Sequence, residues 1–427
     1  MKKLTLNKLD IDVYEETLES GLAVYVAVKE NSSRNYVALT TRYGSDTISF
    51  VPRGKKKMID VPLGVAHFLE HQMFEMEDGT NPLEEFSKSG SNANAYTNND
   101  QTCYLFSGVH NVLENLEYLL KYVSEPYFTD QSVEKEKGII IEELKMYADM
   151  PDTVLYNTIF KNTMKLHPSK EPVIGTIQDI KRTTKEDLYT CYETFYHPSN
   201  MYLLVVGNVD PKAVIEIARN SSLNQKHQKD KKESVQVKHY DEPKTVVKKY
   251  EKKTLDIVLP KIAITWKLNL EHKSVEEKKK LNQYLSILFS AKFGSSSLCL
   301  EELRNEEIIS DILYLDRVTI DDYVLYMMIG ETKEYETLLE KVKKEMKEIT
   351  ISKEDFERKK KVLISSYIYM SDNVDSIAGA LDETIYYYHQ IDDDWYQFLR
   401  NLTWEEMNEM IQMIDFNHFS VVVLESN

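Results

Sequence analysis

The 427-residue chain has few cysteines and no long apolar segment, and both absences restrict what it can be. Its three cysteines, Cys103, Cys191 and Cys299, are widely spaced and form no CxxC pair that would indicate a zinc knuckle or a redox site. No run approaches the roughly 20 apolar residues that span a bilayer, and the first ten residues lack the apolar block of a signal peptide. We therefore expect reduced thiols, no membrane span and a cytoplasmic location.

Basic residues are also in deficit, because 53 Lys and Arg stand against 70 Asp and Glu, a formal net charge of −17 at pH 7. Such a surface repels polyanions, so we expect no nucleic-acid partner. One segment departs from this average: residues 226–253 hold ten lysines and five acids and few large apolar side chains. Since it lacks arginines and interleaved aromatics, we interpret it as a solvated linker rather than an RNA-binding patch.

The segments on either side of this linker follow the same plan. A helical pattern from Thr184 leads through His197-Pro-Ser-Asn to a strand at Met201–Gly207, and a helical pattern from Thr403 leads to a strand at His418–Leu424. Both helices open with a threonine followed by acids, which is typical of a helix N-terminus. The separation of 219 residues, about half the chain, predicts an internal duplication.

Mixed strand and helix patterns on both sides of the linker predict an α+β fold. We expect two homologous halves, each a mostly antiparallel sheet with helices packed on it. The predicted boundaries are residues 1–225 for the first half, 226–253 for the linker and 254–427 for the second half. Long helices are expected at Gln131–Tyr147 and Val275–Phe293, where apolar residues recur with helical spacing.

The most informative motif is His67-Phe-Leu-Glu70-His71. On a helix, His67 and His71 lie one turn apart on the same face, where both imidazoles can bind one metal ion, and Glu70 flanks that face. This HxxEH order is the inverted zinc-peptidase motif. A structural pair of partly exposed histidines is the alternative, because such a pentad arises by chance in roughly one chain of this length in forty.

A catalytic zinc site needs a third protein ligand and one open position. The acidic segment Glu134–Tyr147 is the obvious donor, because Glu136, Ile140 and Glu143 fall on one face of a helix. Two carboxylates beside Ile140 are unusual for a helix that only buries an apolar face. A surface helix rich in Glu and Lys is the alternative.

Three further sequence blocks come after HxxEH. They are Asn92-Ala-Asn-Ala-Tyr-Thr97 with Thr102-Cys-Tyr104, Glu136 with Glu143 seven residues later, and Phe195-Tyr-His-Pro-Ser-Asn-Met201. In this order the blocks resemble the M16 (pitrilysin/insulinase) zinc metallopeptidases, especially short bacterial members similar to mitochondrial processing peptidase subunits. The resemblance implies one zinc ion per chain, with His67, His71 and Glu143 as ligands. It also implies a catalytic base at Glu70 and a catalytic-site carboxylate at Glu136 that orients a ligand histidine.

The resemblance implies a substrate site as well. The segment Ser91–Phe106 is similar to the family's edge strand, to which an extended peptide adds as a further strand through main-chain hydrogen bonds. The implied substrate-binding residues on it are Asn94, Ala95, Tyr96 and Thr97. An ordinary buried hairpin is the alternative.

The second half cannot build a zinc site of its own, because an offset of 219 residues from His67 falls on Ser286, in a segment without histidine. This half instead contains a block similar to the family's Gly-x-Ser-Ser. After that block, the resemblance implies an arginine and, seven residues later, a tyrosine that bind substrate and stabilise the tetrahedral intermediate. Arg304 is present, but position 311 is Asp, and the nearest tyrosine is Tyr314.

We therefore expect a zinc endopeptidase that cleaves short or unfolded peptides or removes leader or presequence segments. Its expected partner is a homologous M16-like subunit that lacks HxxEH and supplies the missing tyrosine in a heterodimer, with a homodimer as the alternative. Two other functions stay open. One is a dedicated leader peptidase in the maturation of a bacteriocin or modified peptide, and the other is a non-catalytic zinc- or peptide-binding subunit.

Overall fold

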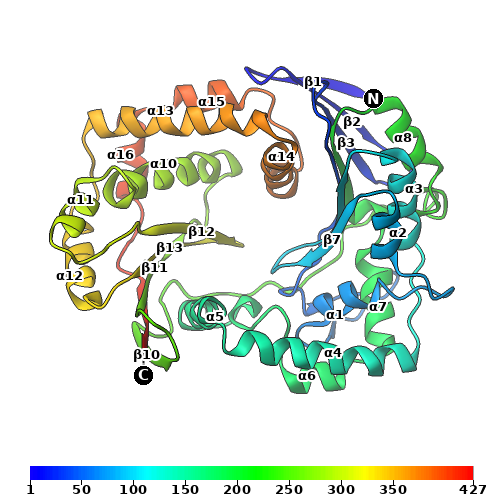
Figure 1. Ribbon diagram of the computed structural model, residues 1–427, viewed down its shortest axis with the longest axis horizontal. Coiled ribbons are helices and arrows are strands. Elements are labelled where there is room, and N and C mark those ends of the chain that lie inside the picture. Colours follow the sequence, from blue (N-terminus) through cyan, green and yellow to red (C-terminus); the bar gives the residue numbers. More distant parts are fainter. Residues whose placement is uncertain (427) are drawn as a thin grey trace. The chain divides into compact units, whose positions relative to one another are not determined.

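The computed structural model describes residues 1–426, which form two compact units (Figure 1). Unit 1 comprises residues 1–144, 172–239 and 368–395, and unit 2 comprises residues 145–171, 240–367 and 396 to the end of the described chain. The units thus interleave segments of the sequence, whereas the predicted boundaries after residues 225 and 253 follow chain order. Those boundaries stay a prediction.

Unit 1 is built on one sheet of seven strands: β1 (Lys2–Leu6), β2 (Ile11–Thr17), β3 (Ala23–Val28), β4 (Asn35–Thr41), β7 (Asn92–Thr97), β8 (Thr102–Gly108) and β9 (Met201–Gly207). The strand order is β1-β2-β3-β9-β4-β8-β7, and every neighbouring pair is antiparallel except β3 with β9. Strand β9 is buried along its whole length, as its apolar sequence predicts. Strand β7 ends the sheet.

Helices cover this sheet: α1 (Val65–Gln72), α2 (Pro82–Lys88), α3 (Val112–Val123), α4 (Asp130–Ala148), α6 (Ile177–Arg182), α7 (Lys185–Phe195), α8 (Pro211–Asn220), α9 (Ser222–Gln225) and α14 (Val374–Tyr388). Shorter elements are β5 (Ser49–Phe50), β6 (Ile59–Asp60) and the 3₁₀ turns η2 (Pro198–Asn200) and η3 (Met370–Asp372). Figure 1 shows α3 and α8 on one face of the sheet and α14 on the other. Apolar side chains of α1, α3 and the strands form a single buried core.

In the sequence, helix α14 lies between two strands of the second sheet, but it packs on the first sheet, against β4 and β9. Tyr202 of β9 donates a hydrogen bond of 2.7 Å to the half-buried carboxylate of Asp382. The guanidinium of Arg42 donates to the backbone carbonyls of Ile385 and Tyr386 in the last turn of α14. Because terminal carbonyls lack partners within a helix, this cation both satisfies them and complements the helix dipole.

Unit 2 contains a sheet of five strands: β10 (Tyr250–Leu255), β11 (Lys261–Asn269), β12 (Tyr314–Ile320), β13 (Tyr323–Glu331) and β14 (Phe419–Ser426). Their order is β10-β14-β11-β13-β12, with β10 and β14 parallel and the other pairs antiparallel. This reproduces the order, chain sequence and strand directions of β3-β9-β4-β8-β7 in unit 1. The predicted α+β fold of two homologous halves is thereby confirmed.

The helices of unit 2 are α5 (Pro151–Thr163), α10 (Val275–Phe293), α11 (Leu298–Asn305), α12 (Tyr335–Glu345), α13 (Lys353–Tyr369), α15 (Trp395–Asn401) and α16 (Trp404–Gln412). Helices α13 and α15 extend across the boundary between the units, and η1 (Pro168–Lys170) is a 3₁₀ turn of unit 2. The two predicted capping threonines both bind their helices: Thr184 forms a full capping box with Asp187, and Thr403 accepts from the backbone of Glu406. Among residues 1–426, no helix combines the length and apolar character of a membrane span.

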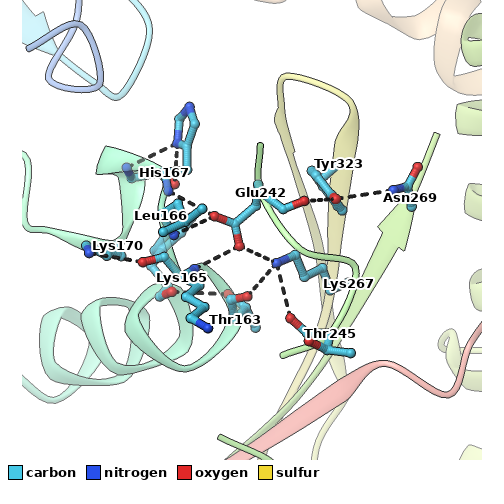
Figure 2. Close-up of polar contacts among 12 residues, drawn as sticks. Thr163, Lys165, Leu166, His167, Lys170, Glu242, Thr245, Lys267, Asn269 and Tyr323 are labelled. Carbon is cyan, nitrogen blue, oxygen red and sulfur yellow. Dashed lines mark hydrogen bonds and ion pairs between the residues drawn. The ribbon is translucent and has the colours of Figure 1, made fainter. Parts of the chain in front are cut away.

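The segment predicted as a linker, residues 226–253, is partly ordered into both units. Its last four residues begin strand β10, because they pair in parallel with β14. Eight residues before β10 begins, the side chain of Glu242 is buried at 3% exposure and accepts backbone hydrogen bonds from Lys165, Leu166 and His167 (Figure 2). Lys267 of β11, with 0% exposure, donates to the same carboxylate at 2.6 Å. This buried pair anchors the chain before β10 to the sheet and to the end of α5.

Replacing Lys267 with Met is expected to destabilise unit 2 by about 3–5 kcal/mol, because it leaves the Glu242 carboxylate buried without a cation. Burial disfavours that carboxylate, but Lys267 and three backbone amides outweigh burial and lower the pKa of Glu242. Its contribution is therefore present above the unfolded pKa of about 4.5 and is lost as the pH falls through the lowered value. Urea unfolding at pH 7, followed by tryptophan fluorescence, measures the change.

Two variants control this experiment. Lys333→Met alters an exposed lysine and is expected to change stability by less than about 0.5 kcal/mol. In Lys267→Met with Glu242→Gln, the buried charge is gone while a carbonyl acceptor remains, so part of the loss is regained. An unfolding midpoint for Lys267→Met equal to that of the wild type contradicts the anchoring role.

Candidate metal centre

Helix α1 carries the HxxEH motif and is fixed at its start by two glycines. Gly64 precedes the helix with φ of 77°, a left-handed conformation that favours glycine, and Gly175 has φ of 79°. The two backbones pack so closely that a Cβ on Gly64 would clash with the carbonyl of Ile174. Phe68 and Leu69 then point into the core with at most 1% exposure. The helix is therefore held on one side, and His67 and His71 occupy the other.

Helix α4 supplies the acidic side chains. Ile140 is buried at 1% exposure, and Glu136 and Glu143 lie one turn before it and one turn after it on the same face. Their carboxylates are 13% and 20% exposed. The predicted helix and its predicted face are thus present, and the face meets the histidines of α1.

Three side chains come together as a metal-ligand set: His67, His71 and Glu143. The Nε2 atoms of the two histidines lie 3.8 Å and 3.4 Å from the Glu143 carboxylate oxygens, and the two rings are 4.6 Å apart. Donors about 2.0–2.1 Å from a tetrahedral zinc ion lie about 3.3–3.5 Å from one another. Two imidazoles and one carboxylate at these separations therefore fit zinc and leave a fourth position open.

Glu136 lies behind this set, with its carboxylate 2.9 Å from Nδ1 of His71. A proton on Nδ1 leaves the lone pair of Nε2 directed toward Glu143, which is the tautomer that a metal requires. Burial opposes a charge on His71, but the two carboxylates outweigh burial and raise its pKa to about 10. Burial and the neighbouring His71 lower the pKa of His67 to about 4. Without a metal, the cation of His71 holds the acids together.

Glu70 is buried at 8% exposure, and its Oε2 atom accepts a hydrogen bond of 2.8 Å from Oγ1 of Thr97 in strand β7. Burial raises the pKa of Glu70. Thr97 is among the expected substrate-binding residues, a role that stays a prediction, and the structure shows its contact with Glu70. No pattern in the sequence signals this bond, because it joins residues 27 positions apart on different elements.

The edge strand lies beside these residues. Asn94 and Ala95 of β7 line a pocket of about 590 Å³ together with Glu70, His71 and Glu136. The same pocket has apolar walls from Phe74, Met76 and Leu83. Because β7 ends the sheet, the outer row of its backbone groups has no strand partner among residues 1–426. Asn94 and Tyr96 are exposed, and Ala95 and Thr97 are half-buried.

The residues expected from the second half belong to unit 2. Arg304 lies on α11, is exposed, and donates from Nε to the carbonyl of Asp311 at 3.3 Å. Tyr314 is the first residue of the edge strand β12 and is 55% exposed. The catalytic role expected of Arg304 stays a prediction.

Two family profiles match most of the chain. The insulinase (peptidase family M16) profile matches residues 59–177, which include α1 and α4. The peptidase M16 inactive domain profile matches residues 182–363. The absence of histidine from the segment around Ser286 agrees with the description of this second domain.

Named relatives agree with the profiles. A Bacillus subtilis (strain 168) protein named uncharacterized zinc protease YmfH is 38% identical over 366 residues, which are 85% of each chain. An Arabidopsis thaliana protein named probable mitochondrial-processing peptidase subunit beta is 29% identical over 204 residues, or 47% of this chain and 36% of that protein.

The fold has a solved counterpart in a protein of Alicyclobacillus acidocaldarius described as an M16-like peptidase. It superimposes with a TM-score of 0.89 at 26% identity and covers 98% of this chain and 99% of its own. A Helicobacter pylori protease superimposes with a TM-score of 0.78 at 20% identity and supports the fold alone. The metal-ligand set on α1 and α4, the duplicated sheets and these relatives lead to one conclusion: the chain belongs to the M16 (insulinase) family of zinc-type peptidases.

Proposed function

We propose that this chain is a zinc-dependent endopeptidase that cleaves extended peptides and acts as the zinc-bearing subunit of a dimer. The observation that carries the proposal is the convergence of His67, His71 and Glu143, with Glu70 beside them at the free edge strand β7. A purely structural histidine pair gives no reason for two acids of α4 to face it. One catalytic zinc ion per chain is proposed for this set.

Zinc held by two imidazoles and a carboxylate supplies Lewis acidity, which acidifies water and polarises a peptide carbonyl. The protein supplies the proton transfers. The Glu70 carboxylate takes a proton from the attacking water and delivers it to the leaving amine. Thr97 holds one oxygen of that carboxylate, so the other oxygen is oriented for this task. Burial, which raises the pKa of Glu70, makes it a stronger base.

The edge strand is proposed to bind substrate by strand addition. The outer backbone groups of β7 pair with an extended peptide, which is a mode that tolerates many sequences and excludes folded proteins. One side chain of that peptide then enters the pocket beside Glu70 and His71. Phe74, Met76 and Leu83 give this pocket apolar walls, and Glu75 and Lys135 add charged groups to its lining.

The dimer proposal rests on the second half. Arg304 is present, but the tyrosine expected at position 311 is Asp, and Tyr314 is the nearest alternative. We propose that a homologous subunit without HxxEH supplies the tyrosine, and that a homodimer relying on Tyr314 is the alternative. The family includes the subunits of mitochondrial processing peptidase, and a relative of this chain bears that name.

One finer function lies within this proposal, and one alternative lies outside it. Removal of leader segments from a bacteriocin or modified peptide precursor uses the same strand-addition site, and it needs only that the leader be extended. A non-catalytic zinc- or peptide-binding subunit is the other reading, and the complete set of Glu70 with three ligands argues against it, because a binding subunit has no need of a buried base.

Replacing Glu70 with Gln is expected to lower kcat for an unstructured peptide by about 10²–10⁴-fold, because the amide cannot accept the proton from water. The zinc content is expected to remain unchanged, because Glu70 is not a ligand. The measurements are steady-state cleavage of a fluorogenic peptide and metal analysis of the same sample. Glu77→Gln, which alters an exposed acid next to the pocket, is the matched control. Retained turnover by pure Glu70→Gln protein contradicts the assignment.

Zinc binding at this set is expected to release about one proton at pH 7.5, because His71, with a pKa raised to about 10, carries a proton that a metal must displace. Zinc affinity therefore falls by about tenfold for each pH unit below 9. Calorimetry in buffers of different ionisation enthalpy counts the protons. Glu136→Gln weakens one of the two carboxylate contacts that raise this pKa, so fewer protons are released. A binding enthalpy that is independent of the buffer contradicts the expectation.

Activity is expected to require a partner. The purified chain alone should cleave peptides weakly, and a homologous subunit lacking HxxEH should raise the rate when added. The homodimer alternative predicts that mixing Glu70→Gln chains with Arg304→Ala chains restores about a quarter of the activity, since half the dimers are mixed and each has one complete site. Full activity of a chain that analytical ultracentrifugation shows to be monomeric overturns both the heterodimer and the homodimer proposals.

A further inference from the structure

A second group of metal-binding side chains lies in unit 1. His197, His227 and Asp230 place their ligand atoms within 4.8 Å of one another. Nδ1 of His227 is 2.7 Å from the Asp230 carboxylate, and Nε2 of His197 is 3.5 Å from it. The two rings are 4.9 Å apart. Among residues 1–426, this group and the set on α1 and α4 are the two that have metal-ligand spacing.

His197 is fixed in place before any ligand binds. It is 5% exposed and caps the 3₁₀ turn η2, with Nδ1 accepting from the backbone of Ser199 at 3.2 Å and lying 2.8 Å from its hydroxyl. Its Nε2 atom is buried, faces the Asp230 carboxylate 3.5 Å away, and makes no hydrogen bond within residues 1–426. A buried polar atom without a partner costs about 1–3 kcal/mol, so such an atom calls for an explanation.

His227 and Asp230 come from one turn of the chain, in which the backbone of Asp230 donates to the carbonyl of His227. Both are partly exposed, at 33% and 47%, so a metal ion from solvent can reach them. Burial and the neighbouring Arg53 lower the pKa of His197 to about 4, and the hydrogen bond from His227 lowers the pKa of Asp230. At neutral pH, His197 is therefore neutral and Asp230 is ionised, which are the forms that bind metal.

We propose that His197, His227 and Asp230 form a second site for a divalent transition-metal ion, zinc in the first place. Two imidazoles and one carboxylate suit zinc and its neighbours in the first transition row, whereas calcium and magnesium prefer all-oxygen sites. The chain then carries two metal ions, one catalytic and one structural. This proposal is independent of the peptidase reaction, because it uses none of the residues of α1 or α4.

Binding at Nε2 of His197 requires one proton to move. The backbone amide of Ser199 donates to Nδ1, so the neutral ring carries its proton on Nε2. A metal at Nε2 requires the other tautomer, in which this single proton has moved to Nδ1 and is donated to the Ser199 hydroxyl. The backbone bond of Ser199 is lost in this exchange. Together with the cation of Arg53, this makes the second site weaker than the catalytic one.

The site joins two parts of the chain that differ in their attachment. His197 lies directly before the buried strand β9, whereas His227 and Asp230 lie at the start of the lysine-rich segment 226–253. Farther along, that segment is tied to unit 1 by backbone hydrogen bonds of Gln236 and Lys238. A metal ion at the three side chains therefore fastens the first turn of the segment, before those bonds begin.

Equilibrium dialysis against micromolar zinc, with metal analysis, tests the proposal in full-length chains. Wild type is expected to hold two zinc ions. His67→Ala with His71→Ala, which removes the catalytic set, should hold one, and the further change His227→Ala should remove it. His227 is chosen because it is partly exposed, whereas His197→Ala risks unfolding the turn before β9. His110→Ala, an exposed histidine outside both groups, is the control and should leave the count unchanged.

Trypsin provides a second measurement, because Lys229, Lys231 and Lys232 flank Asp230. In the His67→Ala, His71→Ala background, zinc should slow cleavage at these lysines several-fold, and His227→Ala should abolish the protection. The proposal is overturned if this background binds no zinc, or if His227→Ala changes neither the zinc count nor the cleavage rate. If the proposed catalytic set binds no zinc but the second site does, the pattern differs. The wild type then holds one zinc ion, which His227→Ala removes and the His67→Ala, His71→Ala changes do not.

Discussion

The structure of the candidate active centre depends on one contact, in which a single turn of α1 faces a single face of α4. Helix α1 has only eight residues, and so short a helix is marginal without tertiary packing. Phe68 and Leu69 anchor it in the core, which leaves His67 and His71 pointing at the acids. The ionic contacts of His71 then hold α4 in register. The convergence of His67, His71 and Glu143 follows from this contact.

The duplication explains why only one half has this centre. Along the chain, α1 lies between β4 and the edge strand β7. In unit 2, α10 has the same place between the corresponding strands β11 and β12. Helix α10 has no histidine, and it buries a long row of apolar side chains that includes Leu285, Leu288 and Phe289. The same scaffold is thus stabilised by core packing in one half and modified for metal binding in the other. Divergence of this kind leaves the fold intact, because sheet order and direction are unchanged.

The sequence was sufficient for features encoded within one element. The spacing of His67 and His71, and the helical face of α4, follow from the geometry of a helix, so both faces could be predicted. The choice of Glu143 as the third ligand came from the resemblance to the M16 family. Features that join distant elements could not be predicted from the sequence. The bond from Thr97 to Glu70, the packing of residues 368–395 on the first sheet, and the group around His197 depend on tertiary contacts that leave no local pattern. The two apposed glycines at the start of α1 belong to the same class.

Anomalous X-ray diffraction at the zinc absorption edge, from crystals of the zinc-loaded chain, tests the central claim most directly. The account predicts the strongest anomalous peak between Nε2 of His67, Nε2 of His71 and the carboxylate of Glu143, at about 2.0–2.2 Å from each. Glu70 should lie beside the ion without binding it. A zinc-loaded crystal with no peak among these three residues would contradict the account.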